Sequence, residues 1–289
     1  MALRYITGRS GQGKTEYLVK EVIRRSIEIP EKQYYVIVPE QFSLEMQRKI
    51  VKMHPRHGFF NIDVLSFHRL SYRIFAECNY QPKEILEDLG VSMMLRKILS
   101  EEEGDFLYFK KSMKKPGFID ELKSMLMEFI GYGVSWKQVE EVTKQLDENK
   151  SLCNKCEELG RIYERFEKAI EGRFMVTEQI LDIAREFTGK APMLKNAVFY
   201  FDGFAGFTPV QMDLIRKLMT RVESMTFVFT IDASQIGFTK PKEYELFRLT
   251  KETVQALVRM AGDEHVDILD YVSGSQTVQI REKHGACRT

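Results

Sequence analysis

Hydrophobic residues near both ends of the chain gather in short, continuous runs of strand-forming types. Helical periodicity, with apolar positions three and four residues apart, follows the runs nearest the N-terminus. Runs that are apolar at nearly every position are typical of parallel strands buried on both faces. The alternation predicts an α/β fold in which helices flank a parallel sheet. The predicted strands are residues 3–7, 34–38, 62–66, 197–201, 225–231 and 265–269, and the predicted helices are residues 14–27, 40–53, 67–78 and 242–260.

The middle of the chain has a different pattern, because helical periodicity dominates there without a convincing strand. Periodic segments occupy residues 118–130, 136–146 and 153–170. Ser135 and Gln138 have the spacing of a capping box and predict the start of one helix. We therefore predict an α/β domain split between residues 1–80 and 190–272, an inserted all-helical subdomain at residues 81–189, and a loose polar tail at residues 273–289.

The composition is that of a folded, globular protein. Hydrophobic residues make up 44% of the 289 residues and charged residues 29%. No apolar run approaches the roughly 18 residues of a membrane span, and the N-terminal residues lack the pattern of a signal peptide. We therefore expect a cytoplasmic protein without a membrane partner. The net charge of +1 gives no electrostatic argument for a dedicated nucleic-acid-binding module.

The four cysteines are too few and too scattered for a disulfide scaffold, and they fit a reducing compartment. Cys153 and Cys156 have the spacing of metal ligands, but they lie on a helical pattern with no second pair nearby. Because a structural zinc ion needs four ligands, we expect these residues to pack and not to bind metal.

The strongest chemical signal is the segment GRSGQGKT (residues 8–15), which matches the pattern G-x-x-x-x-G-K-[ST]. In such loops the glycines let backbone N–H groups surround phosphate oxygens, the lysine reaches the β- and γ-phosphates, and the hydroxyl binds Mg²⁺. A strand precedes the segment and a helix follows it, as the motif requires. The alternative is a glycine-rich turn with an ordinary lysine. The segment predicts that ATP binds to Gly8, Arg9, Ser10, Gly11, Gln12, Gly13, Lys14 and Thr15, and that Thr15 also binds Mg²⁺.

A phosphate-binding loop of this kind needs a metal-holding acid at the end of another strand. Asp202 follows four apolar residues and is the candidate, with Thr15, for holding Mg²⁺. The alternative is an aspartate in an ordinary strand-end turn. The next residue is Gly203, where hydrolysing enzymes of this kind carry a glutamate that orients the attacking water. We therefore expect that ATP is bound but poorly hydrolysed.

Four segments, in this order, resemble motifs of superfamily 1 helicases of the UvrD type. After the phosphate loop, VIVPEQFSLEM (residues 36–46) resembles the next helicase motif, and DVLSF (residues 63–67) resembles the T-x-H-S-F segment that touches DNA. DGFAGFTPVQ (residues 202–211) is similar to D-E-F-Q-D-x-x-P-x-Q, and IDASQ (residues 231–235) is similar to G-D-x-x-Q. Gly203, Ala205 and Gly206 replace polar residues of the helicase motif.

The particular residues of these motifs resemble those of the B subunit of AddAB-type helicase–nucleases, and the resemblance covers residues 1 to about 269. The resemblance implies a RecA-like lobe with an inserted helical subdomain. It implies a part of a complex that processes double-strand breaks for recombinational repair. The implied partners are an AddA-like motor subunit and single-stranded or duplex-end DNA. The family's B subunit continues into a second helicase-like half and a nuclease domain with an iron–sulfur cluster. We expect no such cluster in these residues.

The resemblance also implies roles for individual residues. DNA-binding positions are Gln41, Ser66, Phe67 and His68, and positions similar to the third helicase motif are Asp232 and Gln235. For His68 a packing role at the start of a helix is the alternative. Two other functions remain open, an active ATP-driven DNA translocase and a stand-alone P-loop kinase. Gly203 argues against an active translocase, and the order of four helicase-like motifs gives no support to a stand-alone kinase.

Overall fold

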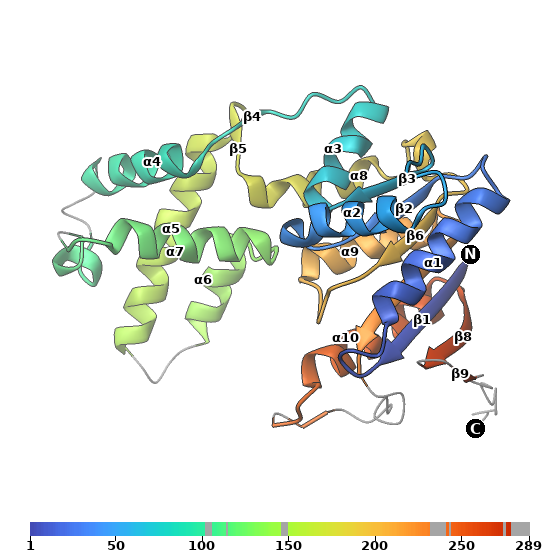
Figure 1. Cartoon of the computed structure of the whole chain (residues 1–289). Helices are drawn as coiled ribbons and strands as arrows, with labels where there is room; N and C mark the ends of the chain where they lie inside the picture. Colours follow the sequence, from blue (N-terminus) through green and yellow to red (C-terminus); the bar gives the residue numbers. More distant parts are fainter. Residues whose placement is uncertain are drawn as a thin grey trace. The chain divides into compact units, whose positions relative to one another are not determined.

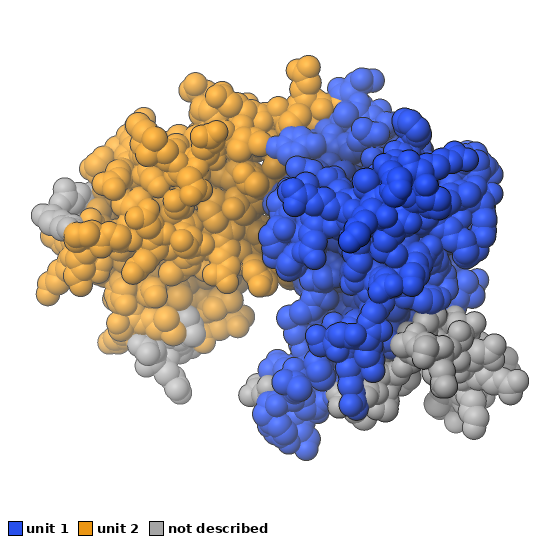
Figure 2. Space-filling model, in the orientation of Figure 1, with its two compact units in different colours: residues 1–79, 184–207, 211–289 blue, residues 80–183, 208–210 orange. Residues whose placement is uncertain are grey.

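The computed structural model describes residues 1–101, 106–113, 115–145, 150–231, 241–242, 244–273 and 276–278. It divides into two compact units (Figure 2). Unit 1 comprises residues 1–79, 184–207 and 211–289, and unit 2 comprises residues 80–183 and 208–210. Asp232, Gln235 and Cys287 lie outside the described residues. In the described part of the chain, no helix has the length and apolar character that crossing a membrane would require.

Unit 1 is built on a seven-stranded sheet in the order β3-β2-β6-β7-β1-β8-β9 (Figure 1). The first six of these strands are parallel, and β9 runs antiparallel to β8. This confirms the predicted parallel α/β sheet. The strands are β1 (Ala2–Gly8), β2 (Tyr34–Ile37), β3 (Ile62–Leu65), β6 (Val198–Phe201), β7 (Ser224–Thr230), β8 (Asp267–Ser273) and β9 (Gln276–Val278). Strand β9 lies in the segment for which the sequence indicates a loose tail, and its three residues are too few for an alternating pattern to be visible.

The helices of unit 1 lie between its strands in the sequence. They are α1 (Lys14–Glu28), the short 3₁₀ helix η1 (Glu40–Phe42), α2 (Ser43–Met53), α3 (Phe67–Glu77), η4 (Pro192–Leu194) and α10 (Arg248–Asp263). Two further helices, α8 (Ile180–Phe187) and α9 (Pro209–Met219), lie at the junctions of the two units in the sequence. Helix α10 begins at Arg248, six residues later than residue 242, where the sequence pattern predicts its start.

The two faces of the sheet bury different kinds of side chain, because neighbouring residues of a strand point to opposite sides. Helices α1 and α2 cover one face through a mainly aliphatic core that includes Ile6, Val36 and Val198 and also the rings of Tyr34 and Tyr200. The opposite face is aromatic. There the rings of Phe201 and Phe227 stack at 4.5 Å between centroids with their planes only 6° apart. The other buried rings on this face belong to Tyr5, Tyr35, Phe199 and Phe229.

Unit 2 consists mainly of four helices around one hydrophobic core. They are α4 (Asp88–Glu101), α5 (Phe118–Gly131), α6 (Trp136–Lys144) and α7 (Lys150–Ile170), with the short η2 (Phe109–Lys111) and η3 (Thr177–Gln179). The predicted capping box is confirmed, since the Ser135 N–H donates to Gln138 Oε1 at 2.7 Å and the Gln138 N–H donates to Ser135 Oγ at 3.4 Å.

The prediction that this unit is all-helical is wrong in one respect. Strands β4 (Glu84–Ile85) and β5 (Phe174–Met175) pair in parallel near the two ends of the unit's sequence. Each strand has only two residues, so neither could produce a periodicity that distinguishes it from a loop. The pair joins segments that are about ninety residues apart, and the pairing is therefore a tertiary contact that a local pattern cannot reveal.

A buried carboxylate on α7 anchors the segment before η2. Glu158 is 6% exposed. Its Oε1 accepts hydrogen bonds from the backbone N–H groups of Leu107 (2.6 Å) and Tyr108 (2.7 Å), and its Oε2 accepts one from the N–H of Phe109 (2.9 Å). A single side chain thus satisfies three backbone donors that lie around fifty residues away in the sequence.

Replacing Glu158 with alanine is expected to destabilise the protein by roughly 3 kcal/mol, because three N–H groups would lose their acceptor at a buried site. The unfolding free energy from urea titration measures this effect. Glu157→Ala, which removes an exposed carboxylate next to Glu158 on α7, is the matched control and should change stability by less than about 0.5 kcal/mol. Equal effects of the two substitutions would contradict the anchoring role.

Candidate functional site

The glycine-rich segment forms the loop that joins β1 to α1. Gly13 is the residue before the first turn of α1 and has a φ of 74°, a left-handed conformation that favours glycine. At Gly8 a side chain would come within 2.7 Å of Gln12 Oε1. The loop is folded on itself, since the Arg9 N–H donates to Gln12 Oε1 at 2.7 Å and Lys14 Nζ donates to the Arg9 carbonyl oxygen at 2.8 Å. The lysine is therefore held beside the backbone of the loop.

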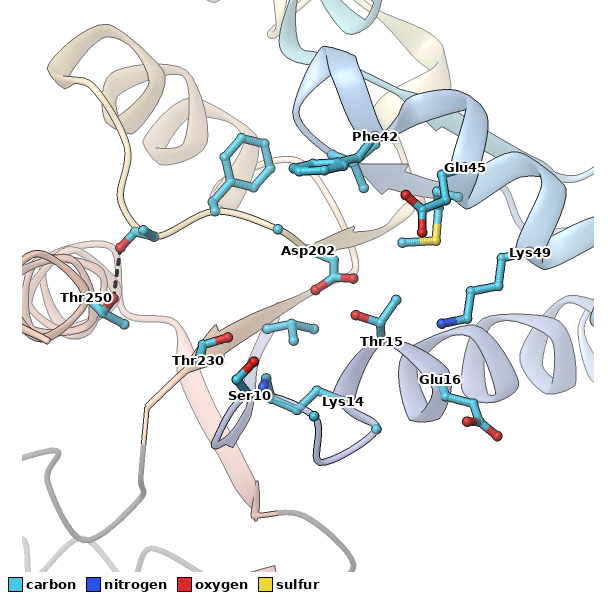
Figure 3. Close-up of a pocket in the computed structure, with 18 of the residues that line it drawn as sticks. Ser10, Lys14, Thr15, Glu16, Phe42, Glu45, Lys49, Asp202, Thr230 and Thr250 are labelled. Carbon is cyan, nitrogen blue, oxygen red and sulfur yellow. Dashed lines mark hydrogen bonds between the residues drawn. The ribbon is translucent and has the colours of Figure 1, made fainter.

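A pocket of about 780 Å³ opens beside this loop. Its walls come from the loop, the first turn of α1, the residues after β6, helix α2 and the start of α10 (Figure 3). All of these segments belong to unit 1. The pocket lies outside the carboxyl ends of the parallel strands, which is where open α/β sheets bind their ligands.

Asp202 lies in the pocket directly after β6, although β7 separates β6 from β1 in the sheet. The carboxylate is 7% exposed, and this burial raises its pKa. A hydrogen bond with the Thr15 side chain and one from the backbone N–H of Gly203 oppose the rise, as do the positive charges of Lys14 and Lys49. Burial lowers the pKa of Lys14, and the negative charge of Asp202 opposes that shift. The geometry therefore brings Lys14, Thr15 and Asp202 together.

Thr15 and Asp202 are the residues that could hold a metal ion in this pocket. A hydroxyl and a carboxylate are oxygen donors, which Mg²⁺ prefers, and Mg²⁺ commonly takes one or two protein ligands and completes its shell with water and phosphate. Nearby positive charges favour the ionised form of this buried carboxylate, so a bound cation would fit it. Among the described residues, no group of three or more histidine, cysteine, aspartate or glutamate side chains is placed to hold a metal ion. Cys153 and Cys156 are half-buried free thiols on α7.

The turn after Asp202 is tight at the position where the helicase motif that it resembles has a glutamate. Gly203 has a φ of 84°, again in the left-handed region. A Cβ atom at this position would lie 3.2 Å from Cδ of Pro39 and 3.6 Å from Cδ2 of Phe42. A side chain at residue 203 would therefore strain the backbone and press against the segment that leads into α2.

The small residues Ala205 and Gly206 allow the start of α10 to pack on the same turn. The Thr250 hydroxyl donates to the Ala205 carbonyl oxygen at 3.1 Å (Figure 3). A Cβ atom at Gly206 would lie 2.7 Å from Cγ of Leu249. The sequence indicates these positions only as losses of polar residues, whereas the structure gives them a packing role. Because the contact joins residues about forty-five positions apart, no local signal could have revealed it.

The four residues that resemble DNA-binding positions have different environments. Gln41 is exposed in η1, and His68 is partly exposed at the start of α3. Ser66 is buried, and its Oγ caps α3 by accepting from the Arg69 N–H at 3.3 Å. Phe67 is 4% exposed and packs against the rings of Phe201, Phe204 and Phe207.

Two charged residues of α2 also line the pocket, and the sequence did not indicate them. Glu45 and Lys49 are four residues apart and so occupy one face of the helix. Figure 3 shows both side chains directed toward Thr15 and Asp202. The spacing could have placed them on a common face, but the pattern does not say which polar face of α2 borders the pocket.

The fold and the pocket together define a class of protein. A glycine-rich loop between the first strand and helix of a parallel sheet, with an aspartate at the end of a second strand, is the arrangement of P-loop α/β domains. A family model described as "ADDB, N-terminal" matches residues 5–284. The chain belongs to this family, and the resemblance found in its motifs is confirmed.

Curated relatives agree with this assignment. The chain is 35% identical over 269 residues to the B subunit of the ATP-dependent helicase/deoxyribonuclease of Lachnoclostridium phytofermentans. It is 31% identical over 268 residues to the protein of the same name from Acetivibrio thermocellus. In both comparisons the match covers 93% of this chain and 23% of the relative, so the chain spans about a quarter of the length of these relatives.

Proposed function

We propose that this chain binds Mg²⁺·ATP in the pocket beside the β1–α1 loop and hydrolyses it only slowly. The observation that carries the proposal is the convergence of Lys14, Thr15 and Asp202 at the carboxyl edge of the sheet. In this proposal the domain is a RecA-like lobe of the superfamily 1 helicase type that binds nucleotide but does not act as a motor.

The loop backbone and the side chains of Lys14, Thr15 and Asp202 have separate roles in this proposal. The backbone N–H groups of the loop and of the first turn of α1 surround the β-phosphate. The amine of Lys14 leaves the Arg9 carbonyl oxygen and donates to phosphate oxygens instead. Thr15 and Asp202 would hold Mg²⁺, which supplies charge neutralisation for the phosphates. Binding thus depends on groups that are all present.

Slow hydrolysis follows from the turn after Asp202. Orientation of the attacking water by a positioned carboxylate typically contributes about 10²–10⁴ in rate. Gly203 offers no side chain, and the left-handed backbone and the contact with Pro39 oppose adding one.

The cellular role that we infer comes from the relatives. Their name, which describes the B subunit of an ATP-dependent helicase/deoxyribonuclease, supports a place in a cytoplasmic complex that processes DNA double-strand breaks for recombinational repair. The partners would be an AddA-like motor subunit and single-stranded or duplex-end DNA. In such an assembly the nucleotide bound here would have a regulatory or stabilising role while the AddA-like motor performs translocation.

Calorimetric titration with Mg²⁺·ATP, followed by a multiple-turnover ATPase assay with and without single-stranded DNA, tests the proposal. Binding with a turnover below about one per second under both conditions supports it. Rapid turnover stimulated by DNA would indicate an active translocase. Phosphoryl transfer to a small acceptor without DNA would indicate a kinase. Failure to bind nucleotide would refute the proposal.

The chain alone is expected to bind single-stranded DNA weakly, with a Kd of about 1–100 μM at physiological salt. The net charge of +1 supplies little attraction for phosphates, and Phe67 is not available for stacking on a base because it is buried. Fluorescence anisotropy of a labelled oligonucleotide over a salt series measures the affinity. Submicromolar binding at physiological salt would contradict this expectation.

A further inference from the structure

We propose that Lys49 makes the pocket selective for nucleoside triphosphates over diphosphates by contacting the terminal phosphate. This inference rests on the proposed function, because it assigns the substrate class of the same pocket. Lys49 lies on α2, on the opposite side of the pocket from the loop that carries Lys14. Its side chain extends from the helix toward Thr15 (Figure 3).

The amine of Lys49 is available for a ligand. Among the described residues, no carboxylate lies within 4.0 Å of it, whereas other lysines such as Lys20 and Lys32 have ion-pair partners. Its positive charge nevertheless acts across the pocket. It opposes the rise that burial causes in the pKa of Asp202, and it adds to the lowering of the pKa of Glu16 that Lys20 mainly causes. A partly exposed cation that points into a phosphate-type pocket without an ion-pair partner is available to meet an incoming anion.

The position of Lys49 relative to Thr15 and Asp202 indicates which phosphate it meets. In P-loop proteins the loop backbone surrounds the β-phosphate, so the γ-phosphate lies beyond it. Here Thr15 and Asp202 would hold the metal ion that neutralises the phosphates on this side of the pocket. Lys49 reaches toward this side of the pocket from α2. A triphosphate would therefore present its terminal oxygens between Lys14 and Lys49, and a diphosphate would end before Lys49.

The charge balance of the pocket makes this contact important. Among the described residues, the ionisable ones that line it are three acids, Glu16, Glu45 and Asp202, and two lysines, Lys14 and Lys49. Without Lys49, the charged residue of α2 that faces the terminal phosphate would be Glu45, whose carboxylate repels it. The loss of Lys49 should therefore weaken ATP binding more than ADP binding, because the loop and Lys14 still hold the β-phosphate.

Calorimetric titration of the full chain with Mg²⁺·ATP and with Mg²⁺·ADP tests the proposal. Lys49→Gln is expected to weaken ATP binding about tenfold or more, the usual effect of losing a charge-assisted hydrogen bond, and ADP binding by less than about threefold. Lys49→Arg should keep the preference for ATP. Lys52→Gln is the matched control, because it removes the same charge from an exposed position three residues further along α2 and outside the pocket, and it should change neither affinity.

Each outcome has one meaning. Equal losses for ATP and ADP, or no loss for either, in Lys49→Gln with an unchanged thermal melting temperature would overturn the role of Lys49 and leave the proposed function standing. Absence of ATP binding by the unmodified chain would overturn the proposed function and this inference together. Selective loss of ATP affinity in Lys49→Gln but not in Lys52→Gln would support both.

Discussion

Lys14→Ala is expected to weaken the binding of Mg²⁺·ATP by at least about a hundredfold, which corresponds to roughly 3 kcal/mol. The lysine is the cation of the loop itself, and it lies close enough to Asp202 for their charges to influence each other's pKa. Its removal deletes a charge-assisted hydrogen bond to phosphate. Removing Lys14 also leaves the phosphates of ATP beside the buried carboxylate of Asp202 with one positive charge fewer to balance the negative charges.

The matched control for this experiment is Arg24→Ala. Arg24 is an exposed residue of the same helix, α1, and pairs with Glu28 one turn further on. The control therefore removes one positive charge from α1 without touching the pocket, and its ATP affinity should equal that of the unmodified chain. Calorimetry gives both constants. Equal affinities for the unmodified chain and Lys14→Ala would show that the glycine-rich segment is an ordinary turn.

Bound ATP is expected to turn over more slowly than about one per second, with or without DNA, and Gly203→Glu is not expected to create a robust ATPase. The backbone at residue 203 has a φ of 84°, which costs a residue with a side chain roughly 1–2 kcal/mol. The first side-chain atom would also lie 3.2 Å from Pro39. The substituted turn would therefore shift, and the new carboxylate would not be held where it could orient water.

Gly203→Ala separates the backbone effect from the chemistry. It introduces the Cβ atom without a carboxylate, so it should lower stability by about the same 1–2 kcal/mol as Gly203→Glu and leave the turnover unchanged. Urea unfolding and a steady-state phosphate-release assay provide the two measurements. A rise in turnover of a hundredfold or more in Gly203→Glu alone would refute the steric argument. A turnover above about one per second in the unmodified chain, lost in Lys14→Ala, would refute slow hydrolysis and favour an active motor.

The sequence predicted those parts of the fold that depend on contiguous residues. The glycines and the lysine of the β1–α1 loop have a fixed spacing that constrains the backbone locally. Strand β6 and Asp202 are visible in the sequence as an apolar run that ends in an acid. Strands β2 and β6 are apolar and buried at every position, so their positions were clear. Strand β8 contains two aspartates, and it begins two residues and ends four residues later than the predicted strand at residues 265–269. Helical periodicity located α5, α6 and α7, and the spacing of Ser135 and Gln138 predicted the hydrogen bonds between them.

The sequence could not predict features that arise from distant contacts. The start of α10 packs on the turn after Asp202 through Thr250 and Leu249, and neither partner indicates the other. Lys49 enters the pocket because of how α2 lies on the sheet, which its helical pattern leaves undetermined. The side-chain environment of Phe67 was also hidden, since its match to a motif that touches DNA in other proteins does not reveal that its ring lies within a cluster of rings.

The contact between Gly206 and Leu249 couples the residues that the chain can carry at these two positions. A Cβ atom at residue 206 would meet three side-chain atoms of Leu249 within 3.1 Å. The side chain of Leu249 is itself largely exposed, so turning it away or shortening it removes little buried surface and has a small effect on stability. A larger residue at position 206 is therefore accommodated by movement of Leu249, and its main consequence is a change in how the start of α10 packs on the turn after Asp202.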